Sequence, residues 1–186
     1  PAGAAKTGRE TESVDAAKAM NKLGDLMRKQ GDLENARTTY EEVLRVREAK
    51  LGGEAPDTLL TKNNLANVMG DQGDLAGARE MYEAVIQAEQ ETLDARYPET
   101  LTTMYNLAIV VKKQGDLVRA RELYEAVVEG REEQLGPGHQ GTLAAKGNLG
   151  NTYQKLAKAA EAGATTAPWS STQSSRSGKA SCRRPW

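Results

Sequence analysis

The chain has 186 residues, with 25 Lys and Arg against 26 Asp and Glu and a formal net charge of −1. This balance argues against a general nucleic-acid binder, because such proteins need a basic surface to neutralise phosphates. The single cysteine, Cys182, excludes an internal disulfide and favours a reducing, cytoplasmic location. No apolar run approaches the roughly 20 residues of a membrane-spanning helix, and we expect no secretory signal.

An internal repeat is the strongest feature of the sequence. Residues 30–33, Gln-Gly-Asp-Leu, recur at 72–75 and at 114–117, which gives a period of 42 residues. Other positions keep this register, among them the tyrosines Tyr40, Tyr82 and Tyr124 and the asparagines Asn64, Asn106 and Asn148. So many coincidences in one register indicate an array of structural repeats.

Each repeat predicts two antiparallel helices. Apolar residues spaced by three, four and seven positions share one helical face, and the repeated tyrosines lie on this face, so we assign them to the core. Gly73 can close one helix in the left-handed conformation, and Asp74 can cap the next. The expected helices span about 14–30, 33–51, 56–72, 75–93, 98–114, 117–135 and 141–158.

Four phrases in these helices resemble the tetratricopeptide repeat. They are residues 64–66 (Asn-Leu-Ala), 72–75, 78–83 (Ala-Arg-Glu-Met-Tyr-Glu) and 131–136 (Arg-Glu-Glu-Gln-Leu-Gly). The usual period of this family is about 34 residues, so each helix here gains about one turn. Such long repeats are typical of kinesin light chains and related proteins. The resemblance implies an all-α, right-handed superhelical solenoid over residues 12–162, with about three and a half repeats.

The resemblance also implies where a ligand binds. The first helix of each repeat would line a concave groove, in which an Asn before the Leu-Ala step bonds the backbone of an extended peptide. Asn64, Asn106 and Asn148 match this position, whereas the first repeat has Lys22 there. An amide suits this role because it both donates and accepts hydrogen bonds. The alternative is that these amides are only solvated.

Neighbouring positions on the same helical faces complete the candidate peptide site. The full set is Asn63, Asn64, Asn67, Tyr105, Asn106, Ile109, Lys112, Lys113, Asn148 and Asn151. Because this set is rich in Asn and leans basic, we expect a protein or peptide partner with acidic side chains, and an apolar anchor against Tyr105 and Ile109. Binding should then weaken at higher salt. The alternative for each lysine is an ordinary solvated charge.

The sequence offers no support for catalysis, a cofactor or a metal. His139 is the only histidine, and it lies in a connection between repeats, where loop packing is its expected role. No phosphate-binding loop is present. The function that fits best is therefore a non-enzymatic interaction module. Two alternatives stay open: a structural piece of a longer array without its own ligand, and a regulatory arm of a multidomain protein.

The two ends of the chain differ in character from the repeats. We expect residues 1–11 to be a disordered N-terminal segment and residues 163–186 to be a disordered, basic tail rich in Ser and Thr. The fourth repeat begins normally and then fails, so the helix near 141–158 must close the array. Its outer side would stay partly apolar, which predicts weak self-association through the C-terminal end.

Overall fold

The computed structural model describes residues 2–92 and 98–161. Every regular element in these two ranges is a helix. The helices are α1 (Ala2–Gln30), α2 (Leu33–Leu51), α3 (Pro56–Gln72), α4 (Leu75–Thr92), α5 (Pro98–Lys113), α6 (Leu117–Leu135) and α7 (Gln140–Glu161). The expected tail at 163–186 lies outside the described residues.

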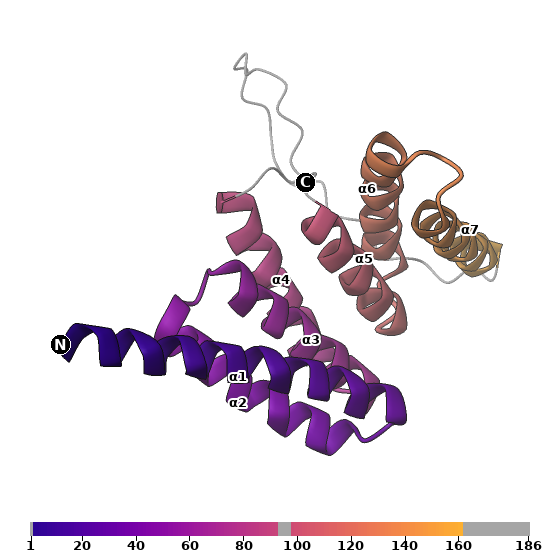
Figure 1. Cartoon of the computed structure of the whole chain (residues 1–186). Coiled ribbons are helices and arrows are strands. Elements are labelled where there is room, and N and C mark those ends of the chain that lie inside the picture. The colour runs from indigo at the N-terminus through magenta and orange to yellow at the C-terminus, as the bar shows by residue number, and fades with distance from the viewer. Residues whose placement is uncertain (1, 93–97, 162–186) are drawn as a thin grey trace, which may run out of the picture.

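The helices form a right-handed α-solenoid in which each helix packs mainly on its neighbours in chain order. Three pairs, α1–α2, α3–α4 and α5–α6, follow one another, and α7 is the first helix of a fourth unit. Figure 1 shows α1 and α2 at one end of the stack and α7 at the other. The long array therefore has two separate ends and one continuous core, as a repeat protein requires.

The turn between paired helices follows from two residues. Gly73 has φ 90° and ψ 0°, a left-handed conformation that avoids strain only without a Cβ, and its N–H donates to the Met69 carbonyl. The Asp74 side chain then accepts from the Gly77 N–H at 3.0 Å, which caps α4. The predicted roles of this glycine and aspartate are confirmed.

Helix α1 begins earlier than the sequence predicts. Residues 1–11 were expected to be disordered, whereas α1 extends to Ala2. The reason is the cooperativity of helix formation. Once residues 14–30 form a helix, each further residue adds one backbone hydrogen bond and does not bear the cost of nucleating a new helix. No proline interrupts residues 2–13, and the helix continues through them.

The core is built from Ala, Val, Leu and Met side chains and one tyrosine per repeat. Tyr40, Tyr82 and Tyr124 are at most 1% exposed, which confirms their assignment. Close helix approach leaves room for nothing larger than glycine at some contacts. A Cβ on Gly24 would lie 2.8 Å from the Tyr40 ring. The large tyrosine therefore fills the space between paired helices in a chain that contains no Phe.

Candidate functional site

Polar side chains link the first helices of successive repeats into one surface. We call this surface, formed by α1, α3, α5 and α7, the first-helix face. Arg28 Nε donates to Asp71 Oδ2 at 2.7 Å between α1 and α3. Asn106 Nδ2 donates to Asn63 Oδ1 at 3.2 Å between α5 and α3. In each pair the residues are 43 positions apart, which is one repeat plus one residue.

The asparagines on α3 form a connected cluster. Asn63 Nδ2 donates to Thr103 Oγ1 at 2.8 Å, and Asn67 Nδ2 approaches Asn63 Oδ1 at 3.4 Å. Asn67 Oδ1 in turn accepts from the Tyr82 hydroxyl at 2.8 Å. These amides are therefore largely committed to holding α3, α4 and α5 in register.

Asn64 is the exception among the α3 asparagines. It is half-buried, and its amide makes no hydrogen bond with the residues that the structure describes. Asn106 is intermediate, because its Nδ2 is engaged by Asn63 while its Oδ1 has no partner in the described ranges. Amide groups of this kind can still bond a peptide unit from outside.

A second cluster joins α5 to α7. Asn148 Nδ2 donates to the Tyr105 hydroxyl at 2.7 Å, and Lys112 Nζ donates to Asn148 Oδ1 at 2.8 Å. Tyr105 packs edge-on against Tyr124, with ring centroids 5.8 Å apart. The Arg131 guanidinium lies 4.8 Å from the centre of the Tyr105 ring, a cation–π arrangement. Asn148 thus uses both ends of its amide within the protein.

The α5–α7 cluster carries positive charge in a partly dry environment. Lys112 Nζ lies 5.4 Å from the centre of the Tyr124 ring. Burial, and to a smaller extent the charge of Lys155, lowers the pKa of Lys112. Burial likewise lowers the pKa of Arg131. A carboxylate placed here would relieve both effects, because an opposite charge favours the charged forms.

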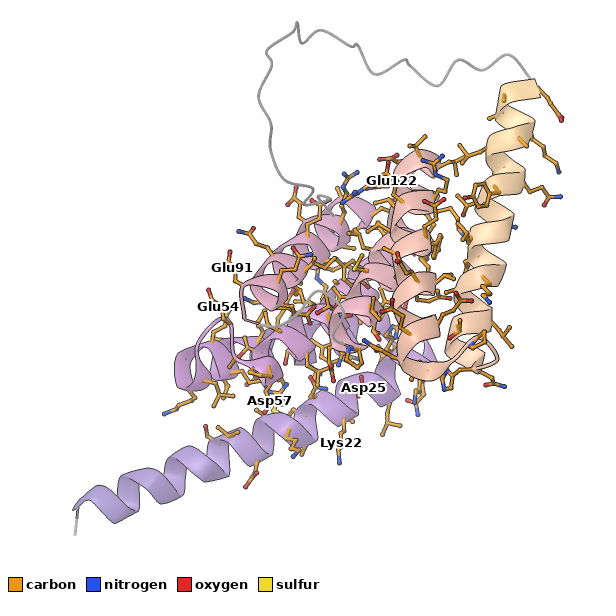
Figure 2. All side chains as sticks on the ribbon, turned by 90° about the horizontal axis from the view of Figure 1, so that it is seen from above. Lys22, Asp25, Glu54, Asp57, Glu91 and Glu122 are labelled. Carbon is orange, nitrogen blue, oxygen red and sulfur yellow. The ribbon has the colours of Figure 1, made fainter. Side chains whose placement is uncertain are left out.

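Two of the predicted site residues lie in solvent, outside the two hydrogen-bonded clusters. Lys113 and Asn151 are exposed, and neither makes a hydrogen bond or ion pair with the described residues. Ile109 is half-buried beside Tyr105 on α5 and packs on the core. The first repeat contributes little, because Lys22 is exposed and projects away from the other helices (Figure 2).

Sequence reasoning missed one contributor and one irregularity. Arg131 was not selected, although its register with Arg47 and Glu89 marks a position that carries a charge in all three repeats. The Tyr124 hydroxyl is buried without a hydrogen-bond partner in the described part of the chain. The equivalent hydroxyls of Tyr40 and Tyr82 donate to Asp25 and Asn67. The third repeat has Ile109 in that register, so the acceptor is missing.

Other chemistry finds no support within residues 2–92 and 98–161. No group of three or more His, Cys, Asp or Glu side chains converges there on a possible metal position. His139 Nδ1 accepts from the Gly141 N–H at 3.1 Å, which fits its expected role in the loop. None of the described helices has the length and apolar content to cross a membrane.

Antiparallel helix pairs with a 42-residue spacing and a shared polar face define a helical repeat protein. Residues 15–91, 60–133 and 99–163 match the tetratricopeptide repeat family. The chain belongs to this family, whose members generally mediate protein–protein interactions as non-enzymatic scaffolds. This confirms the resemblance seen in the sequence.

Solved structures agree with the long-repeat character. The chain is similar to a Podosopora anserina protein assigned as a kinesin light chain with nearly identical TPR-like repeats. That pair is 26% identical with a TM-score of 0.73, covering 80% of this chain and 71% of the other. BtubC (BKLC) from P. vanneervenii shares the fold at 23% identity and a TM-score of 0.67, covering 83% of this chain and 67% of the other.

A more distant neighbour is the N-terminal domain of stress-induced protein-1 from C. elegans. It is 21% identical with a TM-score of 0.51, covering 73% of this chain and 96% of the other, and so shows the shared fold alone. No curated protein matches the sequence. The evidence for a long-repeat architecture like that of kinesin light chains comes from the similarity to these solved structures.

Proposed function

We propose that the chain is a non-enzymatic adaptor, cytoplasmic in location, that holds an extended, acidic segment of a partner protein on its first-helix face. The observation that carries this proposal is the half-buried Asn64, whose amide has no partner within the described residues. A hydrogen bond contributes about 0.5–1.5 kcal/mol net, so a peptide unit that bonds this amide gains about that much.

The expected ligand chemistry follows from the α5–α7 cluster. Lys112 and Arg131 are cations whose charged forms are disfavoured by burial, and Lys113 and Lys155 add exposed charge nearby. A segment with several acidic side chains would compensate these charges, because an opposite charge favours the charged forms. Tyr105, half-buried among them, offers an aromatic surface for an apolar residue next to the acidic one.

Asn64→Ala is the sharpest test of the proposal. The substitution removes no internal hydrogen bond, so thermal stability should stay unchanged. Affinity for the best peptide from an acidic peptide array, measured by fluorescence anisotropy, should fall about three- to tenfold, the value of one hydrogen bond. Asn35→Ala on α2 is the control for affinity, because it removes an Asn from outside the first-helix face. It does not serve as the control for stability, because it also removes the exposed hydrogen bond from Asn35 Nδ2 to Asp32 Oδ2 at 2.8 Å.

A triple variant and a salt series extend this test. Asn64/Asn106/Asn148→Ala should abolish binding while the circular dichroism stays helical. Binding should also weaken between about 50 mM and about 500 mM salt, since screening shortens the reach of exposed charges. If the affinity changes neither in Asn64→Ala nor with salt concentration, the adaptor proposal is refuted.

The mutual bonding of Asn63, Asn106 and Asn148 favours a second candidate function. These amides would then serve only to align consecutive repeats, in a structural piece of a longer array or a regulatory arm. In that case no peptide binds to the wild type, and the triple variant only lowers stability, because it removes the internal hydrogen bonds of Asn106 and Asn148. Weak self-association through the C-terminal end is a separate proposal, because it uses the outer side of α7 rather than the first-helix face.

A further inference from the structure

A charged pair between successive first helices changes character along the array. At the step from α1 to α3, Arg28 Nε lies 2.7 Å from Asp71 Oδ2 and forms an ion pair. Two repeats further along the chain, the same two positions are Lys112 on α5 and Lys155 on α7. The step from α5 to α7 therefore places two cations where the first step has a cation and an anion.

The two lysines are close enough to affect each other. Burial is the larger cause that lowers the pKa of Lys112, and the charge of Lys155 is the second cause. No carboxylate of the described residues forms an ion pair with either lysine. Like charges repel, so this step of the array has the cations of a salt bridge and lacks the anion.

Lys112 is held in position rather than extended into water. Its Nζ donates to Asn148 Oδ1 at 2.8 Å and lies 5.4 Å from the centre of the Tyr124 ring. A lysine that only complements the dipole at the end of α5 needs neither partner, and a solvated lysine directs its ammonium group to water. A positioned ammonium group loses little freedom when it binds a ligand.

Helix α7 supplies further donors beside Lys112. Asn148, Asn151 and Lys155 follow one another at steps of three and four, which places them on one face of the helix. Asn151 and Lys155 are exposed, and the Asn151 amide has no partner among the described residues. Amide and ammonium N–H groups from two helices can therefore reach the oxygen atoms of one anion.

We propose that Lys112, Lys155 and Asn151 bind the phosphate group of a phosphorylated serine or threonine in the partner segment. This inference rests on the proposed function and deepens it, because it makes the affinity depend on whether the partner is phosphorylated. A phosphoserine carries a charge of about −1.5 to −2 and three strong acceptor oxygens, and lysine binds phosphate as a point charge. A single carboxylate would leave one of the two lysines without a counter-ion.

A matched peptide series tests the proposal. In the acidic peptide that binds best, each position in turn carries serine, aspartate or phosphoserine, and fluorescence anisotropy measures the affinity. We expect one position at which phosphoserine binds about tenfold tighter than aspartate, and aspartate tighter than serine. If an acidic peptide binds but phosphoserine nowhere exceeds aspartate, the inference is wrong and the adaptor proposal stands.

Lys155→Asp is the informative variant, because it recreates at this step the arrangement of Arg28 and Asp71. The new carboxylate would pair with Lys112 and take the place of the phosphate, so the preference for phosphoserine over aspartate should disappear. The melting temperature should be unchanged or slightly higher, since repulsion becomes attraction. A loss of the preference would then not reflect unfolding.

Arg45→Asp is the matched control. Arg45 is exposed on α2, outside the first-helix face, and its substitution changes the net charge by the same amount as Lys155→Asp. This control should keep the preference for phosphoserine. If both variants lose the preference equally, it reflects the overall charge of the protein and the inference is overturned.

Two further measurements separate the site from the peptide and from a membrane. Free O-phosphoserine, titrated to about 10 mM, should shift the amide resonances of residues near 112 and 148–155 in the wild type and not in Lys155→Asp. Such shifts without any peptide binding would support the phosphate site and refute the adaptor proposal, whereas no shift would overturn the site. Binding to phosphatidylcholine vesicles that contain phosphatidylinositol bisphosphate, without a preference for phosphopeptides, would assign the site to a lipid and overturn the proposal.

Discussion

The three core tyrosines allow a stability experiment with an internal control. Removing one oxygen atom at Tyr40, Tyr82 or Tyr124 by substitution with Phe leaves packing almost unchanged. Tyr82 donates to Asn67 at 2.8 Å, so its loss should cost about 1 kcal/mol. Tyr40 donates to the Asp25 carboxylate at 2.5 Å, and a bond to a charged acceptor is worth about 1.5–3 kcal/mol, here nearer the lower figure because Asp25 is partly exposed.

Tyr124→Phe should behave in the opposite way. Its hydroxyl is buried without a partner in the described residues, so the protein bears a desolvation cost of about 1–3 kcal/mol without an internal hydrogen bond in return. Removing the oxygen should therefore leave the free energy of unfolding unchanged or raise it by about 1 kcal/mol. Urea denaturation followed by circular dichroism measures all three variants, with an unchanged slope as the sign of an unchanged unfolding reaction.

Supplying the missing acceptor is the converse test. Ile109→Asn in the register of Asn67 should bond the Tyr124 hydroxyl, and this gain offsets part of the lost apolar burial. A double-mutant cycle with Tyr124→Phe isolates the new bond, which should couple the two sites by about 1 kcal/mol. If Tyr124→Phe is as destabilising as Tyr82→Phe, the hydroxyl already has a partner and the reasoning is wrong.

Three further predictions use other features of the array. Burial raises the pKa of the Glu89 carboxyl, and hydrogen bonds with Thr100 and Thr103 partly offset this rise. The charged form of Glu89 therefore lowers the free energy of unfolding at pH values above the pKa of about 4.3 that a glutamate has in the unfolded chain. Glu89→Gln should then raise unfolding free energy near pH 7, and the gain over wild type should shrink as pH falls toward 4.3; a gain independent of pH would contradict this. Gly130→Ala should lower the free energy of unfolding by about 1–3 kcal/mol, because its Cβ would clash with Leu101. Gly147→Ala should raise the free energy of unfolding by about 0.5–1 kcal/mol, because its Cβ would meet open space. Urea denaturation measures both variants, and equal effects would contradict the packing argument. Affinity for an acidic peptide should decline as pH rises toward the ordinary lysine pKa of about 10.4, because burial lowers the pKa of Lys112 and it loses its proton below that value. Lys112→Arg should keep the affinity, as anisotropy titrations would show; an identical decline in the variant would exclude Lys112 from the site.

The helix boundaries were predictable because they depend on local chemistry. Gly73 and Asp74 end one helix and begin the next through contacts within four residues. The start of α3 at Pro56 is equally local, since proline fits the first turn of a helix. Helices α2, α3 and α6 accordingly begin and end where the sequence predicts. The predicted start of α1 near residue 14 was wrong, because no residue type there forces a helix boundary.

The state of the candidate site was less predictable, because it depends on how far each repeat is displaced from the last. The sequence places Asn64, Asn106 and Asn148 at equivalent positions, yet the structure gives them three different environments. Asn64 has no internal partner, Asn106 is half engaged and Asn148 is fully engaged. The difference arises from non-equivalent neighbours: Asn63 faces Asn106, whereas Tyr105 faces Asn148. Periodicity alone does not reveal such pairings.

These unequal environments define what a bound peptide must offer. Asn106 Nδ2 donates to Asn63, so only its Oδ1 can bond a ligand without breaking an internal contact, and that oxygen requires a peptide N–H. Asn64 can accept an N–H and donate to a carbonyl. A scan in which each backbone nitrogen of a bound peptide is methylated in turn should therefore find one or two sensitive positions, with losses of about three- to tenfold each. One of them should become insensitive in Asn106→Ala, because the bond is already absent there. Sensitivity spread evenly along the peptide, and unchanged in Asn106→Ala, would show that this amide serves only to hold α3 and α5 together.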